Sequence, residues 1–166
     1  MTSAPPAPIT IRRCHEADLT VVAALYRAWE AEDITWGLRA DDEGALREKL
    51  GPFFLVAEVE VERTRDADRR PPSIGFVTAQ IRHAAPGEVA VFPAGAAYLE
   101  VEDLYVTTAW RDAGVGTHLM EHLFEAARAQ GVESSLVFSA TKDLARIVRF
   151  YERFGYQPWG VQFFKQ

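Results

Sequence analysis

The sequence contains one cysteine, Cys14, in 166 residues. A single thiol excludes an internal disulfide framework and a cysteine-based zinc site. No stretch reaches the roughly 18–20 consecutive apolar residues that a membrane-spanning helix needs, so we expect no membrane partner. A lone thiol also suits a reducing compartment, and we therefore expect a cytoplasmic protein.

The chain also has fewer basic than acidic residues. The chain has 18 Lys and Arg against 24 Asp and Glu, which gives a net charge of −6 and a pI near 5.2. This balance argues against a nucleic-acid partner, because nucleic-acid binding by a whole domain relies on excess positive charge. An acidic chain is compatible with cationic substrates. The apolar fraction of 48% and charged fraction of 25% are close to globular averages, which excludes a disordered or fibrous protein.

The N-terminus lacks the basic start and apolar run of a signal peptide. Residues 1–8 are small residues and prolines, and we expect a flexible tail there because proline cannot sit inside a helix. The remaining residues, 9–166, are expected to form a single domain, since two domains in this length would each have a small core.

The hydrophobic pattern along the chain alternates between strand-like and helix-like segments. We expect strands at 9–12, 53–61, 74–81, 97–106, 135–139 and 156–164. We expect helices at 16–29, 41–50, 113–130 and 143–154. The polar segment 62–73 and the Pro- and Gly-containing segment 84–96 are expected to be loops. This mixture predicts an α/β (α+β layered) domain.

A glycine-containing turn lies between the 97–106 strand and the 113–130 helix. Backbone N–H groups at a helix start lack intrahelical partners and, with the helix dipole, favour phosphate oxygens. Gly114 and Gly116 have no Cβ and would let a diphosphate approach the backbone closely. Arg111 could add a charge-assisted contact.

Two common phosphate-binding motifs do not match this turn. No lysine follows Gly116, which disfavours a nucleoside triphosphatase. A dinucleotide-binding fingerprint would need its third glycine at Leu119, so an oxidoreductase module fails on spacing.

The turn resembles motif A of the GNAT superfamily, the Gcn5-related N-acetyltransferases, whose signature is Arg/Gln-x-x-Gly-x-Gly/Ala. Arg111, Gly114 and Gly116 fill that signature. The segment 150–156, Phe-Tyr-Glu-Arg-Phe-Gly-Tyr, is similar to the family's Phe/Leu-Tyr-x-x-x-Gly-Phe/Tyr segment. The resemblance covers about 9–164 and implies the GNAT fold, a central, mostly antiparallel twisted sheet with helices on both faces.

The resemblance implies acetyl-coenzyme A (acetyl-CoA) as cosubstrate and no metal. Its pantetheine arm would pair with the backbone of Leu104, Tyr105 and Val106, like an added strand. Its diphosphate would lie on the amides of a continuous run: Asp112, Ala113, Gly114, Val115, Gly116 and Thr117. Homodimers are common in the family, so a homodimer is an expectation by analogy.

The resemblance also implies catalytic roles. Tyr151 matches the position whose hydroxyl approaches the coenzyme sulfur, and we expect it to be the acid, although helical spacing also suits a core tyrosine. Glu100 and Glu102 are alternative bases, two residues apart on one face of a strand, although either could attract substrate without moving a proton. Asp103 is expected on the opposite face. The Val106 N–H is expected to stabilise the oxyanion.

Three further features leave alternatives open. Many relatives carry an asparagine that contacts the pantetheine arm where this chain has Leu144, so Asp143 or Lys142 would have to supply that contact. His118 and His122 have a zinc-compatible spacing but no evident third ligand, so we expect an exposed helix face. The aromatic residues Trp29, Trp36 and Phe92 either line an acceptor pocket or belong to the core.

The resemblance therefore implies an enzyme that transfers acetyl from acetyl-CoA to a primary amine, and we expect this amine on a small molecule and direct attack in a ternary complex. A protein N-terminus or lysine as acceptor, and a CoA-binding sensor without turnover, remain the alternatives.

Overall fold

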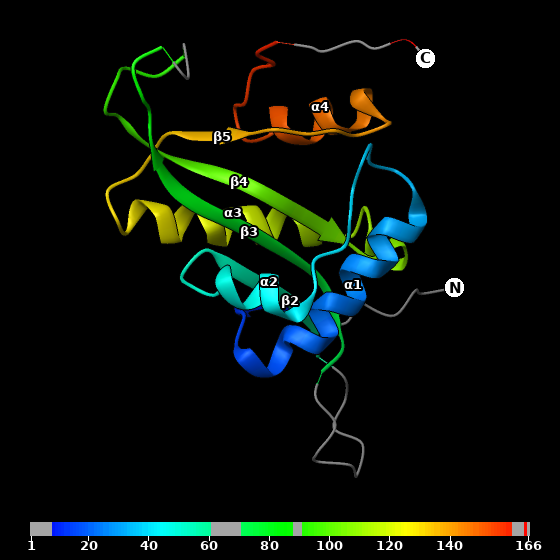
Figure 1. The fold of residues 1–166 in the computed structure, drawn as a ribbon. Helices are drawn as coiled ribbons and strands as arrows, with labels where there is room; N and C mark the ends of the chain where they lie inside the picture. The colour runs from blue at the N-terminus through cyan, green and yellow to red at the C-terminus, as the bar shows by residue number, and fades with distance from the viewer. Residues whose placement is uncertain (1–7, 61–70, 88–90, 161–164, 166) are drawn as a thin grey trace.

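The computed structural model describes residues 8–60, 71–87, 91–160 and 165 (Figure 1). Within these residues five strands form one sheet in the order β1-β2-β3-β4-β5. The strands are β1 (Ile9–Arg13), β2 (Phe54–Val59), β3 (Ser73–His83), β4 (Ala97–Val106) and β5 (Ser135–Val137). β1 to β4 are antiparallel neighbours, and β5 runs parallel to β4. The sheet is therefore mixed and mostly antiparallel, as predicted.

Helices cover both faces of this sheet. α1 (Leu19–Glu32) and α2 (Glu43–Glu48) lie on one face, and α3 (Val115–Arg128) lies on the other (Figure 1). α4 (Leu144–Glu152) follows β5 and places Tyr151 in the core on the α3 side. Two short 3₁₀ turns complete the described elements, η1 (Glu16–Asp18) and η2 (Thr108–Trp110).

Strand β2 shows how the two cores form. Its side chains alternate between faces, as in any strand. Phe54 and Val56 pack in the core beneath α1, and Leu55 and Ala57 pack in the core beneath α3. All four are buried, because both faces of the sheet are covered. Such a strand has a continuous apolar sequence, which is why the pattern predicted it well.

The helix boundaries differ from the sequence prediction by a few residues, as α1 and α3 show. The first helix was expected at 16–29, but residues 16–18 form η1 and α1 continues to Glu32. It ends where Asp33 adopts a left-handed conformation with φ 52°. The helix expected from residue 113 begins at Val115, because Gly114 precedes it with φ 83°.

The strand expected at 156–164 is absent from its described part, residues 156–160. Pro158 has no N–H to donate to a ladder, and Gly160 has φ 80°. Tyr156 packs its ring against Tyr151 instead, with centroids 5.4 Å apart. The rest of that expected strand, 161–164, lies outside the described residues. So do 1–7 of the expected tail, the last residue of the expected 53–61 strand, 62–70 of the first expected loop and 88–90 of the second.

Candidate active site

The strands β4 and β5 pair over only three residues and then separate. Their register joins Leu99, Glu100 and Val101 to the whole of β5. Beyond Val101 a cavity of about 230 Å³ opens between the two strands. It is lined from α1, the loop after α1, β4, the end of β5 and α4, by Trp29, Thr35, Trp36, Gly37, Leu38, Val101, Glu102, Asp103, Leu104, Val137, Phe138, Ser139, Ala140 and Tyr151.

The end of β4 presents main-chain groups to this gap. Thr107 donates its N–H to the Ile74 carbonyl, on the β3 side, over 2.9 Å. Because the amides of alternate residues point to the same side of a strand, those of Leu104 and Val106 point away from β3, toward the gap. The amide of Tyr105, between them, points toward β3. Two of the three residues predicted to pair with pantetheine therefore turn their amides toward the gap, and one of them, Leu104, also lines the cavity.

A β-bulge in β4 lies beside the cavity. Asp103 pairs with Thr78 and Val101 pairs with the next residue, Ala79, which leaves Glu102 as the extra residue. An extra residue shifts the alternation of side chains beyond it. We expected Asp103 on the face opposite Glu102, and this was wrong: Thr78 and Gln80 share one face of β3, and they bond Asp103 and Glu102 respectively.

The two candidate bases have different surroundings. Glu102 lines the cavity and accepts a hydrogen bond from the neutral amide of Gln80. Glu100 is outside the lining and forms an ion pair with Arg82. Hydrogen bonding to Glu100 and its negative charge raise the pKa of Arg82. The structure thus brings Glu102, rather than Glu100, to the cavity.

Asp103 is held by groups behind the cavity. Its Oδ2 accepts a 2.8 Å hydrogen bond from Thr78 and lies 2.8 Å from the Lys49 Nζ. Lys49 also lies 2.8 Å from Asp41 Oδ2. Burial acts to lower the pKa of Lys49, but the two carboxylates outweigh it and the pKa is raised. This ion cluster fixes the segment that follows Glu102.

Tyr151 reaches the cavity from α4 and is 8% exposed. Burial raises the pKa of its phenol, and the nearby Tyr156 adds to the shift. Its hydroxyl therefore keeps its proton throughout the neutral range. Tyr151 and Glu102, from elements far apart in sequence, line the same cavity.

The turn before α3 leaves main-chain amides without a side-chain cap. Gly114 is the N-cap residue, and no side chain caps this helix end. The first intrahelical bond runs from the His118 N–H to the Gly114 carbonyl over 3.0 Å, which leaves the preceding amides without helical partners. Gly116 serves a different need: a Cβ there would lie 3.3 Å from the Phe150 ring, so α4 packs closely on the turn. Asp112 is exposed and has φ 63°.

The Arg111 side chain bonds residues of β4 and α1. Its Nε donates to the Val106 carbonyl over 2.9 Å, and its terminal nitrogen forms an ion pair with Glu32. Glu32 also accepts hydrogen bonds from the Tyr105 hydroxyl at 2.6 Å and the Thr108 hydroxyl at 3.2 Å. Burial acts to raise the pKa of Glu32, but the bonds from Tyr105 and Arg111 and the Arg111 charge outweigh it, so the pKa is lowered. Sequence reasoning missed Glu32, because its partners are distant in the chain.

The loop after α1 forms one wall of the cavity. Trp36 has a half-exposed side chain, and its main-chain N–H donates to the Ala140 carbonyl over 2.8 Å. Lys142 donates its N–H to the Ile34 carbonyl over 2.9 Å, and its Nζ lies 4.4 Å from the Trp36 ring centroid. These bonds join the 33–38 loop to the segment between β5 and α4. Of the candidate aromatic residues, Trp29 and Trp36 line the cavity.

The third candidate aromatic residue, Phe92, does not line this cavity, and neither do Leu144, His118 and His122. Phe92 packs on Tyr98, with ring centroids 5.0 Å apart, in a separate small cluster. Leu144 begins α4 and is 49% exposed. His118 and His122 are exposed on α3, as expected, and among the described residues no group of three or more His, Cys, Asp or Glu is arranged to hold a metal ion.

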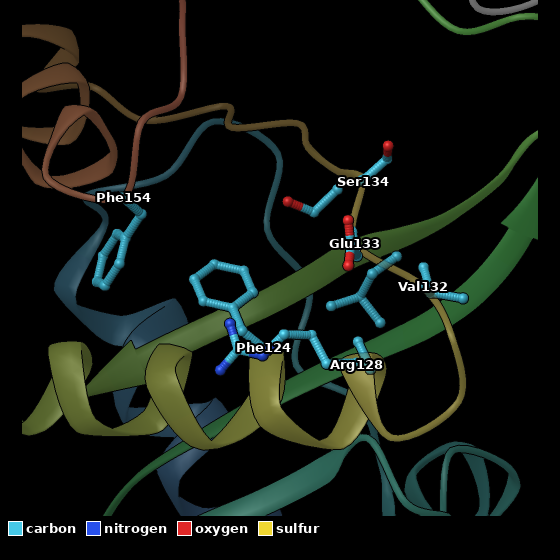
Figure 2. A pocket seen from close by; sticks show the side chains of 9 residues that line it. Phe124, Arg128, Val132, Glu133, Ser134 and Phe154 are labelled. Atoms are coloured by element: carbon cyan, nitrogen blue, oxygen red, sulfur yellow. The ribbon is translucent and has the colours of Figure 1, made fainter.

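A second cavity, of about 320 Å³, lies where α3 ends and β5 begins (Figure 2). Phe124 and Arg128 of α3, Phe154 after α4, and the Val132–Ser134 segment surround it. None of the predicted catalytic or coenzyme-binding residues lines it.

A family model described as the acetyltransferase (GNAT) domain matches residues 54–158. The chain therefore belongs to the GNAT acetyltransferase family. It is an acyltransferase dependent on acetyl-CoA, as the resemblance implied. No helix among the described residues is long and apolar enough to cross a membrane.

Solved structures with the same fold include an aminoglycoside acetyltransferase, meta-AAC0020, from an uncultured soil metagenomic sample, in complex with trehalose. It has 22% sequence identity and a TM-score of 0.63, with 95% of each chain covered. The aminoglycoside N-acetyltransferase AAC(6')-Iy in complex with CoA has 16% identity, a TM-score of 0.69 and 99% of each chain covered. An acetyltransferase from Trypanosoma brucei has 18% identity and a TM-score of 0.61, with 96% of this chain and 99% of that chain covered. A search of curated proteins found no match.

Proposed function

We propose that this protein transfers an acetyl group from acetyl-CoA to a primary amine of a small molecule, by direct attack in a ternary complex. The observation that carries the proposal is the placement of Glu102 and Tyr151 in one cavity, beside a strand end whose Leu104 and Val106 amides face the same gap. A base, an acid and an extended binding edge are the groups that such a transfer needs.

The coenzyme follows the main chain in this proposal. Its pantetheine arm adds to β4 along Leu104–Val106, in the space that the separation of β5 leaves open. Its diphosphate lies at the start of α3, on the amides from Asp112 to Thr117. Because α3 has no side-chain cap, those amides have no competing side-chain acceptor at the N-cap position.

Glu102 accepts a proton from the acceptor ammonium, directly or through water, and leaves a neutral amine. The amine nitrogen attacks the thioester carbonyl carbon and forms the new C–N bond. The Val106 N–H, which faces the gap, stabilises the oxyanion. As the C–S bond breaks, the thiolate takes the Tyr151 hydroxyl proton, and the extra proton on the new amide nitrogen passes to solvent. Exchange with solvent then returns a proton to Tyr151 and removes one from Glu102.

The cavity walls favour a small acceptor over a protein segment. Trp36 bonds to Ala140, and Ile34 bonds to Lys142, so the two loops are joined at one end of the cavity. A peptide needs an open groove through which its chain can continue on both sides. A small amine needs only the cavity, with Trp29 and Trp36 as aromatic walls.

The test measures free thiol release from acetyl-CoA with a panel of acceptors. The panel contains an aminoglycoside such as sisomicin, a polyamine, an aromatic monoamine, free amino acids and a lysine-containing peptide. We expect release with at least one small amine and mass-spectrometric detection of the acetylated product. Acetylation of the peptide alone would support the protein-acceptor alternative. Coenzyme binding by titration calorimetry without release for any acceptor would support the sensor alternative.

A further inference from the structure

The Arg111 guanidinium bonds two acceptors that belong to different elements. Its Nε donates to the carbonyl of Val106, the last residue of β4, over 2.9 Å. Its terminal nitrogen pairs with Glu32, the last residue of α1. A guanidinium is a planar fork, so fixing one of its acceptors fixes the orientation toward the other.

Glu32 is itself fixed by neighbours of the strand end. One of its oxygens accepts hydrogen bonds from the Tyr105 hydroxyl at 2.6 Å and from the Thr108 hydroxyl at 3.2 Å. The other oxygen pairs with Arg111. The side chains of Arg111 and Glu32 are only 20% and 23% exposed, so solvent screens this pair weakly.

We propose that Glu32 is a positioning residue for the coenzyme site: it orients Arg111 so that the guanidinium caps the Val106 carbonyl and holds the end of β4 with the Val106 N–H facing the gap. This inference rests on the proposed function. In this inference Arg111 binds the Val106 carbonyl of β4, whereas the sequence suggested that Arg111 binds the diphosphate of the coenzyme.

The two roles for Arg111 predict opposite effects of removing the Glu32 charge. If Arg111 is a phosphate ligand, Glu32 competes with the diphosphate, and its loss frees the guanidinium and strengthens coenzyme binding. If Glu32 positions the strand end through Arg111, its loss weakens binding of the pantetheine arm, whether or not a diphosphate is attached.

The experiment compares acetyl-CoA with S-acetyl-pantetheine, which lacks the diphosphate, on the wild type and Glu32→Gln. Dissociation constants come from titration calorimetry for acetyl-CoA and from competition for S-acetyl-pantetheine. We expect Glu32→Gln to weaken both ligands by a similar factor, about 5- to 20-fold, since one charge-assisted contact is lost. Tighter acetyl-CoA binding, unchanged binding of both ligands, or weakening confined to acetyl-CoA would each overturn the inference.

A second variant, Arg111→Lys, separates charge from geometry. Lysine keeps the positive charge that a phosphate needs but has no fork to bond Val106 and Glu32 together. We expect Arg111→Lys to weaken both ligands like Glu32→Gln, and the double variant to be no weaker than either single variant beyond about twofold. Preserved binding in Arg111→Lys would overturn the inference even if Glu32→Gln failed to fold.

The matched control is Glu16→Gln, which removes a carboxylate from the exposed Glu16–Arg47 pair. We expect its dissociation constants to match those of the wild type, and circular dichroism to show the same fold in all variants. A tenfold effect of Glu16→Gln would mean that net charge, rather than position, controls binding, and would overturn the inference. A wild type that binds neither ligand would instead overturn the proposed function.

Discussion

Thr78 donates a 2.8 Å hydrogen bond to Asp103, across a bulge that places Asp103 on the same face of the sheet as Glu102. Lys49 neutralises Asp103 from behind the cavity. Glu102, bonded to the neutral amide of Gln80, is therefore the carboxylate at the cavity available to an ammonium group. The adjacent acidic residues thus have separate tasks: Asp103 stabilises the bulge, and we assign proton transfer to Glu102.

Glu102→Gln and Glu100→Gln form a matched pair of variants. We expect Glu102→Gln to lower kcat at neutral pH by about 100-fold or more, because the base is lost. Glu100→Gln should change kcat less than about threefold, since Glu100 pairs with Arg82 outside the cavity. Steady-state rates from pH 6 to 9 check both. Equal effects of the two substitutions would contradict the assignment.

Tyr151→Phe keeps the aromatic ring and removes the proposed acid. We expect kcat at saturating substrates to fall by about 10- to 1000-fold, while the KM for acetyl-CoA changes little. Since burial raises the pKa of Tyr151, the wild-type rate should show no loss from ionisation of this phenol below pH 9. The control is Tyr156→Phe. It removes a hydroxyl that accepts a hydrogen bond from Ser135, and neither residue lines this cavity. An unchanged kcat in Tyr151→Phe would show that Tyr151 acts only in packing.

Trp36→Ala tests whether the loop after α1 binds the acceptor. Trp36 lines the cavity and is half exposed, so its removal takes away apolar contact area without opening the core. We expect the acceptor KM to rise by about 5- to 30-fold, the loss of one aromatic contact of about 1–2 kcal/mol, while the KM for acetyl-CoA stays unchanged. A change in the acetyl-CoA KM alone would place Trp36 on the coenzyme side.

The ion pair of Glu32 predicts a pH-dependent contribution to stability. The folded pKa of Glu32 is lowered, because hydrogen bonds from Tyr105 and Arg111 outweigh burial. A lowered pKa gives stability that is fully present above the unfolded value of about 4.3 and is lost as the pH falls through the folded value. We expect Glu32→Gln to cost about 1 kcal/mol at pH 7 and progressively less below about pH 4. Urea unfolding at both pH values checks this, and a cost that stays constant would contradict it.

Local features were predictable from the sequence, and long-range pairings were not. The apolar run of β2 and the glycines before α3 are local signals, and the resemblance located Tyr151 in α4. The face of Asp103 was predicted wrongly, because plain alternation contains no sign of the extra residue at Glu102. The partner of Arg111 could not be found either, since Glu32 meets it only after α1 packs on the sheet. These are consequences of packing rather than of local propensity.

The bulge in β4 makes the placement of Glu102 depend on the number of residues in this strand. Deleting either residue between Val101 and Leu104 would restore simple alternation with the pairing to β3 kept on both sides, and would leave one carboxylate there instead of two. A substitution in this stretch would replace one side chain, whereas a deletion would also remove the local bend of the strand beside the cavity. Among natural variants of this chain, insertions and deletions should thus accumulate in the 84–96 connection and avoid the stretch around Glu102.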